Sequence, residues 1–131
     1  MPKMNQSFFQ QPTVALAKHL LGCRLVHVLG SEIVSGIIVE TEAYLWKDDP
    51  ACHAAIGETK RNRIMFGPAG CLYVYSIHNR TCMNIVSEKV GRGAAVLIRA
   101  IEPTHGIECM SRLRPVLKLR DLTNGPGKLC Q

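Results

Sequence analysis

The fold is decided by the stretch Ile37-Ile38-Val39-Glu40-Thr41-Glu42-Ala43-Tyr44, an apolar run that ends in two carboxylates and a tyrosine at alternate positions. Side chains alternate between the faces of a strand, so Glu40, Glu42 and Tyr44 are expected on one face, neighbours about 7 Å apart. A carboxylate beside apolar strand surface loses solvation, which raises its proton affinity and makes it a better base. The stretch therefore predicts a site; an ordinary half-buried strand with a solvated face is the alternative.

The residues before this stretch predict a β-hairpin. Residues Arg24 to Leu29 and Glu32 to Tyr44 have the composition of two strands, and Gly30-Ser31 forms a tight connection between them. The catalytic candidates then lie at the far end of the second strand.

Two helices are expected, one before the first strand in the sequence and one after the last. Pro12 suits the first turn of a helix that ends at Gly22, with apolar residues on one side: Val14, Ala17, Leu20 and Leu21. Thr104 is expected to cap a short second helix, whose apolar side consists of Ile107, Met110 and Leu113.

The remaining segments predict loops and further strands. Residues Leu45 to Gly70 contain charges, prolines and glycines without sustained periodicity, which indicates a long ordered loop, and loops of this length are usually functional or mobile. Strands are expected at Cys71 to Ser76 and at Ala94 to Arg99, the second apolar enough to be central. Residues Asn124 to Gly127 predict a turn in front of a new helix. Together these elements predict an α+β domain.

Length and composition favour one folded domain over residues 1–131. Apolar residues make up 47% of the chain, enough for a modest single core without metal or disulfide support. There are 16 basic and 10 acidic residues, and the pI is near 9.2. This balance is typical of proteins with a polyanionic partner, although basic proteins without one also exist.

Cysteine usage and the terminus indicate the compartment. The six cysteines are scattered, with no C-x-x-C pair: Cys23, Cys52, Cys71, Cys82, Cys109 and Cys130. Most lie in apolar runs, as buried free thiols do, which favours a reducing, intracellular location. No segment approaches the length of a membrane span, and the N-terminus lacks the apolar core of a signal peptide. A soluble protein without a membrane partner is expected.

Seven short motifs together resemble the alkyladenine (3-methyladenine) DNA glycosylase family. They occur in the family's order and cover the chain from Phe8 to Gln131: Val39-Glu40-Thr41-Glu42-Ala43-Tyr44-Leu45; His53; Arg61-Asn62-Arg63 with Met65-Phe66; Leu72-Tyr73-Val74-Tyr75; Cys82-Met83-Asn84; Leu97-Ile98-Arg99-Ala100 with Glu102-Pro103; and Gly125-Pro126 with Lys128-Leu129-Cys130-Gln131. The resemblance implies a single domain with a curved, mainly antiparallel sheet and short helices.

The resemblance also implies an activity, the excision of alkylated or deaminated purines from double-stranded DNA. Such enzymes flip the nucleotide into a pocket and hydrolyse its N-glycosidic bond as a step of base-excision repair. The hydrolysis requires a base that deprotonates water and a departing purine, so neither a metal nor another cofactor is expected. The location would be the cytoplasm or nucleoid of a bacterium, or the nucleus of a eukaryote.

Site roles follow from the matching positions. The resemblance implies that Glu42 activates the water and that Arg99 helps to hold the water and the phosphate region. Tyr44 and Tyr75 would sandwich the flipped base, and His53 would contact it from the pocket wall. Stacking contributes about 1–3 kcal/mol per base, and a cationic alkylated purine gains further through a cation–π interaction.

Two further groups complete the implied site. Asn84 would exclude guanine by clashing with its exocyclic amine. Lys60, Arg61 and Arg63 form a compact basic cluster suited to phosphate contacts, with a solvated turn as the alternative interpretation.

The chain departs from the family in two places. After Tyr75 the family usually has an aromatic-Gly-Met-aromatic run whose tyrosine fills the gap left by the flipped nucleotide, whereas this chain has Ser76-Ile77-His78-Asn79-Arg80-Thr81. His78 is the nearest candidate for that wedge and a DNA contact, although its ring is smaller. Family members also continue beyond the Lys-Leu-Cys-Gln segment, so the C-terminal part of the domain is expected to be missing.

Two other functions are consistent with parts of the sequence. Two carboxylates about 7 Å apart on one strand face also suit an inverting glycoside hydrolase. Against it, the chain has one tryptophan and a basic charge, whereas sugar sites usually have stacking tryptophans. The other alternative is a non-catalytic remnant of the glycosylase family that binds DNA without excision.

Overall fold

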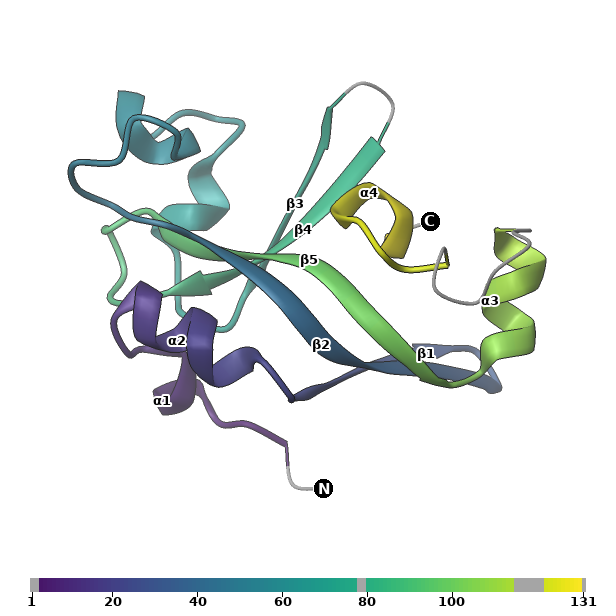
Figure 1. The fold of residues 1–131 in the computed structure, drawn as a ribbon. Helices are drawn as coiled ribbons and strands as arrows, with labels where there is room; N and C mark the ends of the chain where they lie inside the picture. The colour runs from purple at the N-terminus through teal and green to yellow at the C-terminus, as the bar shows by residue number, and fades with distance from the viewer. Residues whose placement is uncertain (1–2, 78–79, 115–121, 131) are drawn as a thin grey trace.

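The computed structural model describes residues 3–77, 80–114 and 122–130, and it is an α+β fold around one antiparallel sheet (Figure 1). Five strands lie in the order β1-β2-β5-β4-β3. Their bounds are β1 Arg24–Leu29, β2 Glu32–Tyr44, β3 Leu72–Ile77, β4 Arg80–Ser87 and β5 Ala94–His105. The curved, antiparallel sheet with short helices is the predicted architecture, and it is confirmed.

The helices are short and lie around the sheet. They are α1 Gln6–Phe9, α2 Thr13–Leu20, the 3-10 turns η1 His53–Ile56 and η2 Arg63–Phe66, α3 Ile107–Leu113 and α4 Pro126–Leu129. In Figure 1 α4 lies in the fork where the β3–β4 hairpin diverges from β5. The backbone carbonyl of Thr123, just before α4, accepts a hydrogen bond from the Ile101 amide at 3.2 Å.

The β1–β2 hairpin has the predicted bounds. Leu29 lies opposite Glu32, and the antiparallel pairing continues to Arg24 opposite Ile37. Gly30 has φ 61°, a left-handed conformation that glycine adopts without steric cost, which explains the tight connection.

A local shift in the pairing of β2 with β5 decides which side chains reach the site. Ile38 lies in the buried cluster under α2, and the Thr41 hydroxyl donates to the α2 carbonyl of Ala17 at 2.9 Å. Residues three apart in a regular strand point to opposite faces. The register shifts on either side of Glu40, which lets both side chains face α2. Glu42 therefore points to the face away from the helix.

Two buried clusters lie on opposite faces of the sheet. Ile85 and Val96 are paired across β4 and β5 and belong to the cluster under α2. The next pair, Val86 and Ala95, belongs to a second cluster formed with the segment between β2 and β3. Neighbouring residues of a strand face opposite ways, so this segment, predicted only as an ordered loop, covers the face that α2 leaves open.

The apolar face of α2 differs from the prediction at two positions. Its buried residues are Thr13, Leu16, Ala17 and Leu20, whereas Val14 and Leu21 are 47% and 45% exposed. The buried spacing of three, four and seven residues starts one position earlier than expected. The predictions for Val14 and Leu21 were therefore wrong.

The N-terminus of α2 is capped by a distant residue. Pro12, at the cap position, has no side-chain hydrogen bond to the helix. The Glu88 carboxylate accepts a bond from the Thr13 amide at 3.3 Å and another from the Thr13 hydroxyl. Arg92 holds the same carboxylate at 2.9 Å. A carboxylate at the positive end of a helix is favourable.

The second predicted helix exists, but its cap was wrong. Thr104 belongs to β5, which continues to His105, six residues beyond the predicted end at Arg99. Its hydroxyl lies 3.2 Å from that of Ser35. Gly106, with φ 73°, precedes α3 instead. Cys109 is buried on α3, whereas Leu113 is 59% exposed.

The cysteines and helices bear on the expected compartment. The described cysteines are free: Cys52, Cys82 and Cys109 are buried, Cys23 and Cys130 are half-buried, and Cys71 is exposed. Within residues 3–77, 80–114 and 122–130, none of the helices has the length and apolar character needed to span a membrane.

Candidate active site

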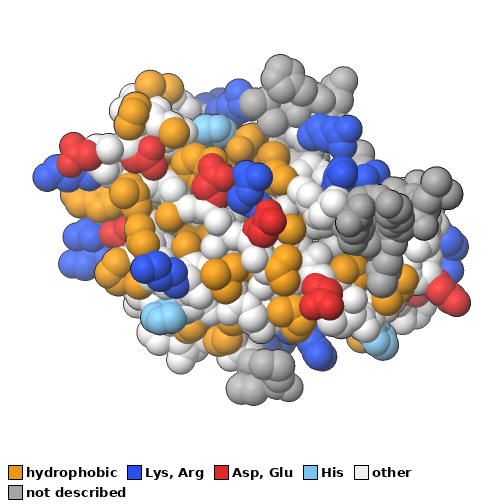
Figure 2. Space-filling view, in the orientation of Figure 1, with side chains coloured by type: hydrophobic (Ala, Val, Ile, Leu, Met, Phe, Trp, Pro, Cys, Tyr) orange, Lys and Arg blue, Asp and Glu red, His pale blue; other side chains and the backbone are white. Residues whose placement is uncertain are grey.

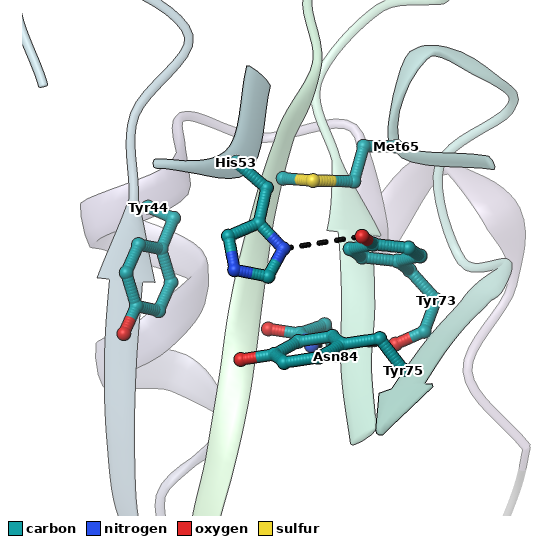
Figure 3. Close-up of a pocket in the computed structure, with 6 residues that line it drawn as sticks. All are labelled: Tyr44, His53, Met65, Tyr73, Tyr75 and Asn84. Atoms are coloured by element: carbon teal, nitrogen blue, oxygen red, sulfur yellow. Dashed lines mark hydrogen bonds between the residues drawn. The ribbon is translucent and has the colours of Figure 1, made fainter. Parts of the chain in front are cut away.

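Six residues from five elements line one pocket on the sheet face opposite α2 (Figure 3): Tyr44, His53, Met65, Tyr73, Tyr75 and Asn84. The residues come from β2, η1, η2, β3 and β4, so the pocket forms only when the segment between β2 and β3 folds back over the sheet. The free volume is about 10 Å³, about the room that one water molecule needs. A purine would fit only if these side chains moved apart.

Aromatic rings fill most of the pocket. The His53 and Tyr75 ring centroids are 4.4 Å apart, and those of Tyr73 and Tyr75 are 5.5 Å apart. The His53 ring points into the space between Tyr44 and the two tyrosines of β3 (Figure 3), and its Nδ1 lies 3.1 Å from the Tyr73 hydroxyl. These flat surfaces are suited to stacking against another ring.

Burial keeps the pocket side chains uncharged near neutral pH. It raises the pKa of Tyr75 to about 12, and burial followed by the neighbouring Glu42 carboxylate raises the pKa of Tyr44. Burial, followed by the positive charge of Arg61, lowers the pKa of His53. The pocket thus presents neutral rings.

A group of three charged side chains lies beside Tyr44. Arg99 Nη1 is 2.8 Å from Glu42 Oε2, and Arg99 Nε is 3.8 Å from Glu40 Oε2. The other Glu42 oxygen accepts a hydrogen bond from the Tyr44 hydroxyl. The expected common face of Glu40, Glu42 and Tyr44 is consistent with these contacts. The Glu42 side chain is still 41% exposed, so its desolvation is only partial.

Asn84 forms the floor of the pocket from β4. It is 3% exposed, and its Nδ2 donates to the Tyr73 carbonyl on the paired strand at 3.3 Å. This bond orients the carboxamide.

The basic residues of the predicted phosphate cluster are exposed but not equivalent. Lys60 and Arg63 are exposed on the segment that carries η1 and η2. Arg61 Nη2 instead donates to the Ser76 carbonyl on β3 at 3.1 Å. Figure 2 shows one face of the molecule, in the orientation of Figure 1, with most of its Lys and Arg side chains near the margins. His78, the candidate wedge, lies outside the described residues.

The structure adds two residues to the predicted pocket, Met65 and Tyr73. Tyr73 is 2% exposed, and both residues were named only within motifs of the family resemblance. Among the residues that the structure describes, no cluster of three or more His, Cys, Asp or Glu side chains is arranged to hold a metal ion.

Comparisons with known proteins identify the family of the chain. The family model described as Methylpurine-DNA glycosylase (MPG) matches residues 7–131. A protein of Methanocella arvoryzae is 51% identical over 132 residues, covering 99% of this chain and 66% of the relative. One from Chlorobium phaeobacteroides is 52% identical over 98% of this chain and 66% of the relative. One from Oceanobacillus iheyensis is 50% identical over 96% of this chain and 64% of the relative.

Each of these three relatives has the name "Putative 3-methyladenine DNA glycosylase". The comparisons therefore place the chain in a class of proteins described as DNA glycosylases. More narrowly, the chain belongs to the methylpurine-DNA glycosylase family. It spans 64–66% of the length of these relatives.

Proposed function

We propose that this chain provides the base pocket of a DNA glycosylase that hydrolyses the N-glycosidic bond of alkylated or deaminated purines in double-stranded DNA. One observation carries the proposal: the Glu42 carboxylate, held by Arg99 at 2.8 Å and by the Tyr44 hydroxyl, lies beside a pocket lined by aromatic rings. Family membership supports the same chemistry.

The first proposed step is extrusion of the damaged nucleotide. A base within a duplex is inaccessible, and flipping costs a few kcal/mol of stacking and pairing, least for a damaged base. Tyr44 and Tyr75 would stack on the flipped purine, each base–aromatic contact contributing about 1–3 kcal/mol. His53 must separate from Tyr75, because their centroids are only 4.4 Å apart.

The second proposed step is hydrolysis. Glu42 accepts a proton from a water molecule, the water oxygen bonds to the sugar C1′ atom, and the bond from C1′ to the purine nitrogen breaks with its electron pair on the purine. Arg99 keeps the carboxylate oriented and helps to hold the water. The step relies on protein side chains alone, without a metal or cofactor.

Selectivity would come from the pocket floor and from charge. Asn84 would exclude the exocyclic amine of guanine, since its carboxamide is buried and oriented by Tyr73. Neutral, electron-rich rings favour cationic alkylated purines. Lys60 and Arg63 are free to contact phosphates, and such contacts set position without reading sequence.

The alternatives receive less support. A paired-carboxylate glycoside hydrolase needs both acidic groups for catalysis, whereas Arg99 contacts both Glu40 and Glu42. A DNA-binding remnant without excision would retain the pocket, and family membership gives no reason to prefer it. An intracellular location fits a DNA-repair protein.

The proposal is tested by incubating the chain with a duplex containing one hypoxanthine and cleaving abasic sites with alkali. Strand cleavage is expected. The matched control is Glu42→Gln, which keeps the size of the side chain; excision should fall about 100-fold or more while lesion binding remains. Excision that is absent in the wild type, or equal in both proteins, would contradict the proposed reaction.

A further inference from the structure

Asn62 is a buried polar residue in the segment that covers the pocket face. It is 3% exposed, and its Nδ2 donates to two carbonyls, that of His53 at 2.9 Å and that of Gly57 at 3.0 Å. Its Oδ1 accepts from the Thr59 amide at 2.6 Å. A buried carboxamide with these bonds orders the turn around it, because loss of either group leaves backbone atoms unsatisfied.

The same residue contacts both 3-10 turns that reach the pocket. Its side chain holds the carbonyl of His53, the first residue of η1, and its backbone carbonyl accepts from the Met65 amide in η2 at 2.9 Å. His53 and Met65 both line the pocket. Asn62 therefore links the two pocket residues that are not carried by the sheet.

Asn62 also lies between two cationic residues with different surroundings. Arg61 is bonded to the Ser76 carbonyl, one residue beyond Tyr75, whereas Arg63 is exposed. Asn62 is hydrogen-bonded to the carbonyl of His53 and covalently joined to Arg61 and Arg63. A displacement of this turn would therefore move the basic side chains and His53 together.

We propose that Asn62 is a positioning residue that fixes the His53 wall of the base pocket relative to the basic cluster at residues 60–63. When this cluster contacts the DNA backbone, Asn62 would fix the position of His53 against the flipped purine. This inference rests on the proposed function, but the position of His53 can be tested without DNA. Asn62 itself touches no reacting atom.

The first test is an NMR titration of the His53 imidazole in the whole chain. Asn62→Ala removes both donors to the His53 and Gly57 carbonyls, so the ring should become more exposed and move away from Tyr73. Because burial lowers the pKa of His53, release should shift that pKa upward, toward the ordinary value of about 6.5. His53→Gln identifies the resonance.

The matched control is Thr59→Val. It removes the Thr59 hydroxyl, which accepts a hydrogen bond from the backbone amide of Asn62 at 3.2 Å in the same turn. It leaves the bond from the Asn62 side chain to the His53 carbonyl. Its His53 pKa should stay at the wild-type value. If Asn62→Ala does not fold, Asn62→Leu keeps the size of the side chain and loses the donors without adding a charge near His53. An unchanged His53 pKa in the folded Asn62 variant, or an equal shift in the control, would overturn the proposal.

The second test measures binding to a hypoxanthine duplex and to the matched undamaged duplex over a range of salt concentrations. The Asn62 variant should lose preference for the lesion by about tenfold, the usual scale for one lost buried hydrogen-bond partner. Its salt dependence should stay unchanged, since the cations remain. A parallel loss on both duplexes would overturn the positioning role. A wild type without lesion preference would instead contradict the proposed function, while the titration still decides the role of Asn62.

Discussion

The two faces of the sheet are built from the same strands but from different chemistry. Under α2 the buried residues are aliphatic, and Leu16 and Ile98 are fully buried. The opposite face carries tyrosines and polar groups. Glu42 on β2 and Asn84 on β4 point to this face, although residues next to them in the same strands face α2. Burial without polar atoms stabilises a fold, whereas hydrogen-bonded polar groups at the rim of a pocket supply chemistry. One face should therefore determine stability and the other activity.

The largest effect on stability is expected from Leu16→Ala on the aliphatic face. The side chain has no exposed surface, so its truncation leaves a cavity and should lower the free energy of unfolding by about 2–5 kcal/mol. Urea denaturation measures this change. At low temperature the folded variant should keep the wild-type lesion preference. A selective loss of lesion binding would show that the faces are not independent.

On the pocket face, Asn84→Ala should change selectivity more than stability. Removing the carboxamide eliminates a clash with the guanine amine and one hydrogen bond to Tyr73, which costs about 1 kcal/mol of folding free energy. Excision of unmodified guanine should rise while hypoxanthine excision changes little. Parallel loss of both activities with a lower melting temperature would mean that Asn84 is structural only.

The double variant Lys60→Ala with Arg63→Ala distinguishes phosphate binding at the rim of the pocket face from lesion binding in its interior. Both residues are exposed, so binding to damaged and undamaged duplexes should weaken alike. The salt dependence should flatten by about one slope unit per lost phosphate contact. Arg61 is left unchanged because it is bonded to Ser76. A loss confined to the damaged duplex would contradict a phosphate role.

The smallest effect is expected from Glu40→Gln. Its carboxylate is 3.8 Å from Arg99, and both side chains are more than a third exposed, so the pair contributes about 1 kcal/mol or less. Excision should fall by about fivefold at most. A loss as large as that of Glu42→Gln would support the paired-carboxylate mechanism.

Much of the sheet was predictable because its patterns are local. The β1–β2 hairpin followed from alternation around Gly30-Ser31, and its bounds agree with the structure. β4 was missed because polar Thr81, Asn84 and Ser87 interrupt its apolar residues, although pairing on both sides buries most of the strand. β5 continues through Pro103, although proline has no amide hydrogen to donate and is usually confined to edge strands, first positions and bulges.

The candidate site was predicted in part, for different reasons. The spacing of Glu42 and Tyr44 suggested a shared face, whereas the role of Arg99 came only from family resemblance. The contact of Arg99 with Glu42 joins residues 57 positions apart, which no local pattern reveals. Asn62 gave no signal of its own, because burial of a polar residue in a loop depends on the folded turn around it.

The cap of α2 has a consequence for the order of folding. The helix has eight residues, too short to be stable alone in water, and the carboxylate that caps it belongs to Glu88, 75 residues from Thr13. Contacts between such distant residues require closure of a long loop, which is slow. The helix should therefore become stable only after the turn between β4 and β5 has formed, so the N-terminal segment would be among the last parts of the chain to gain protection from hydrogen exchange.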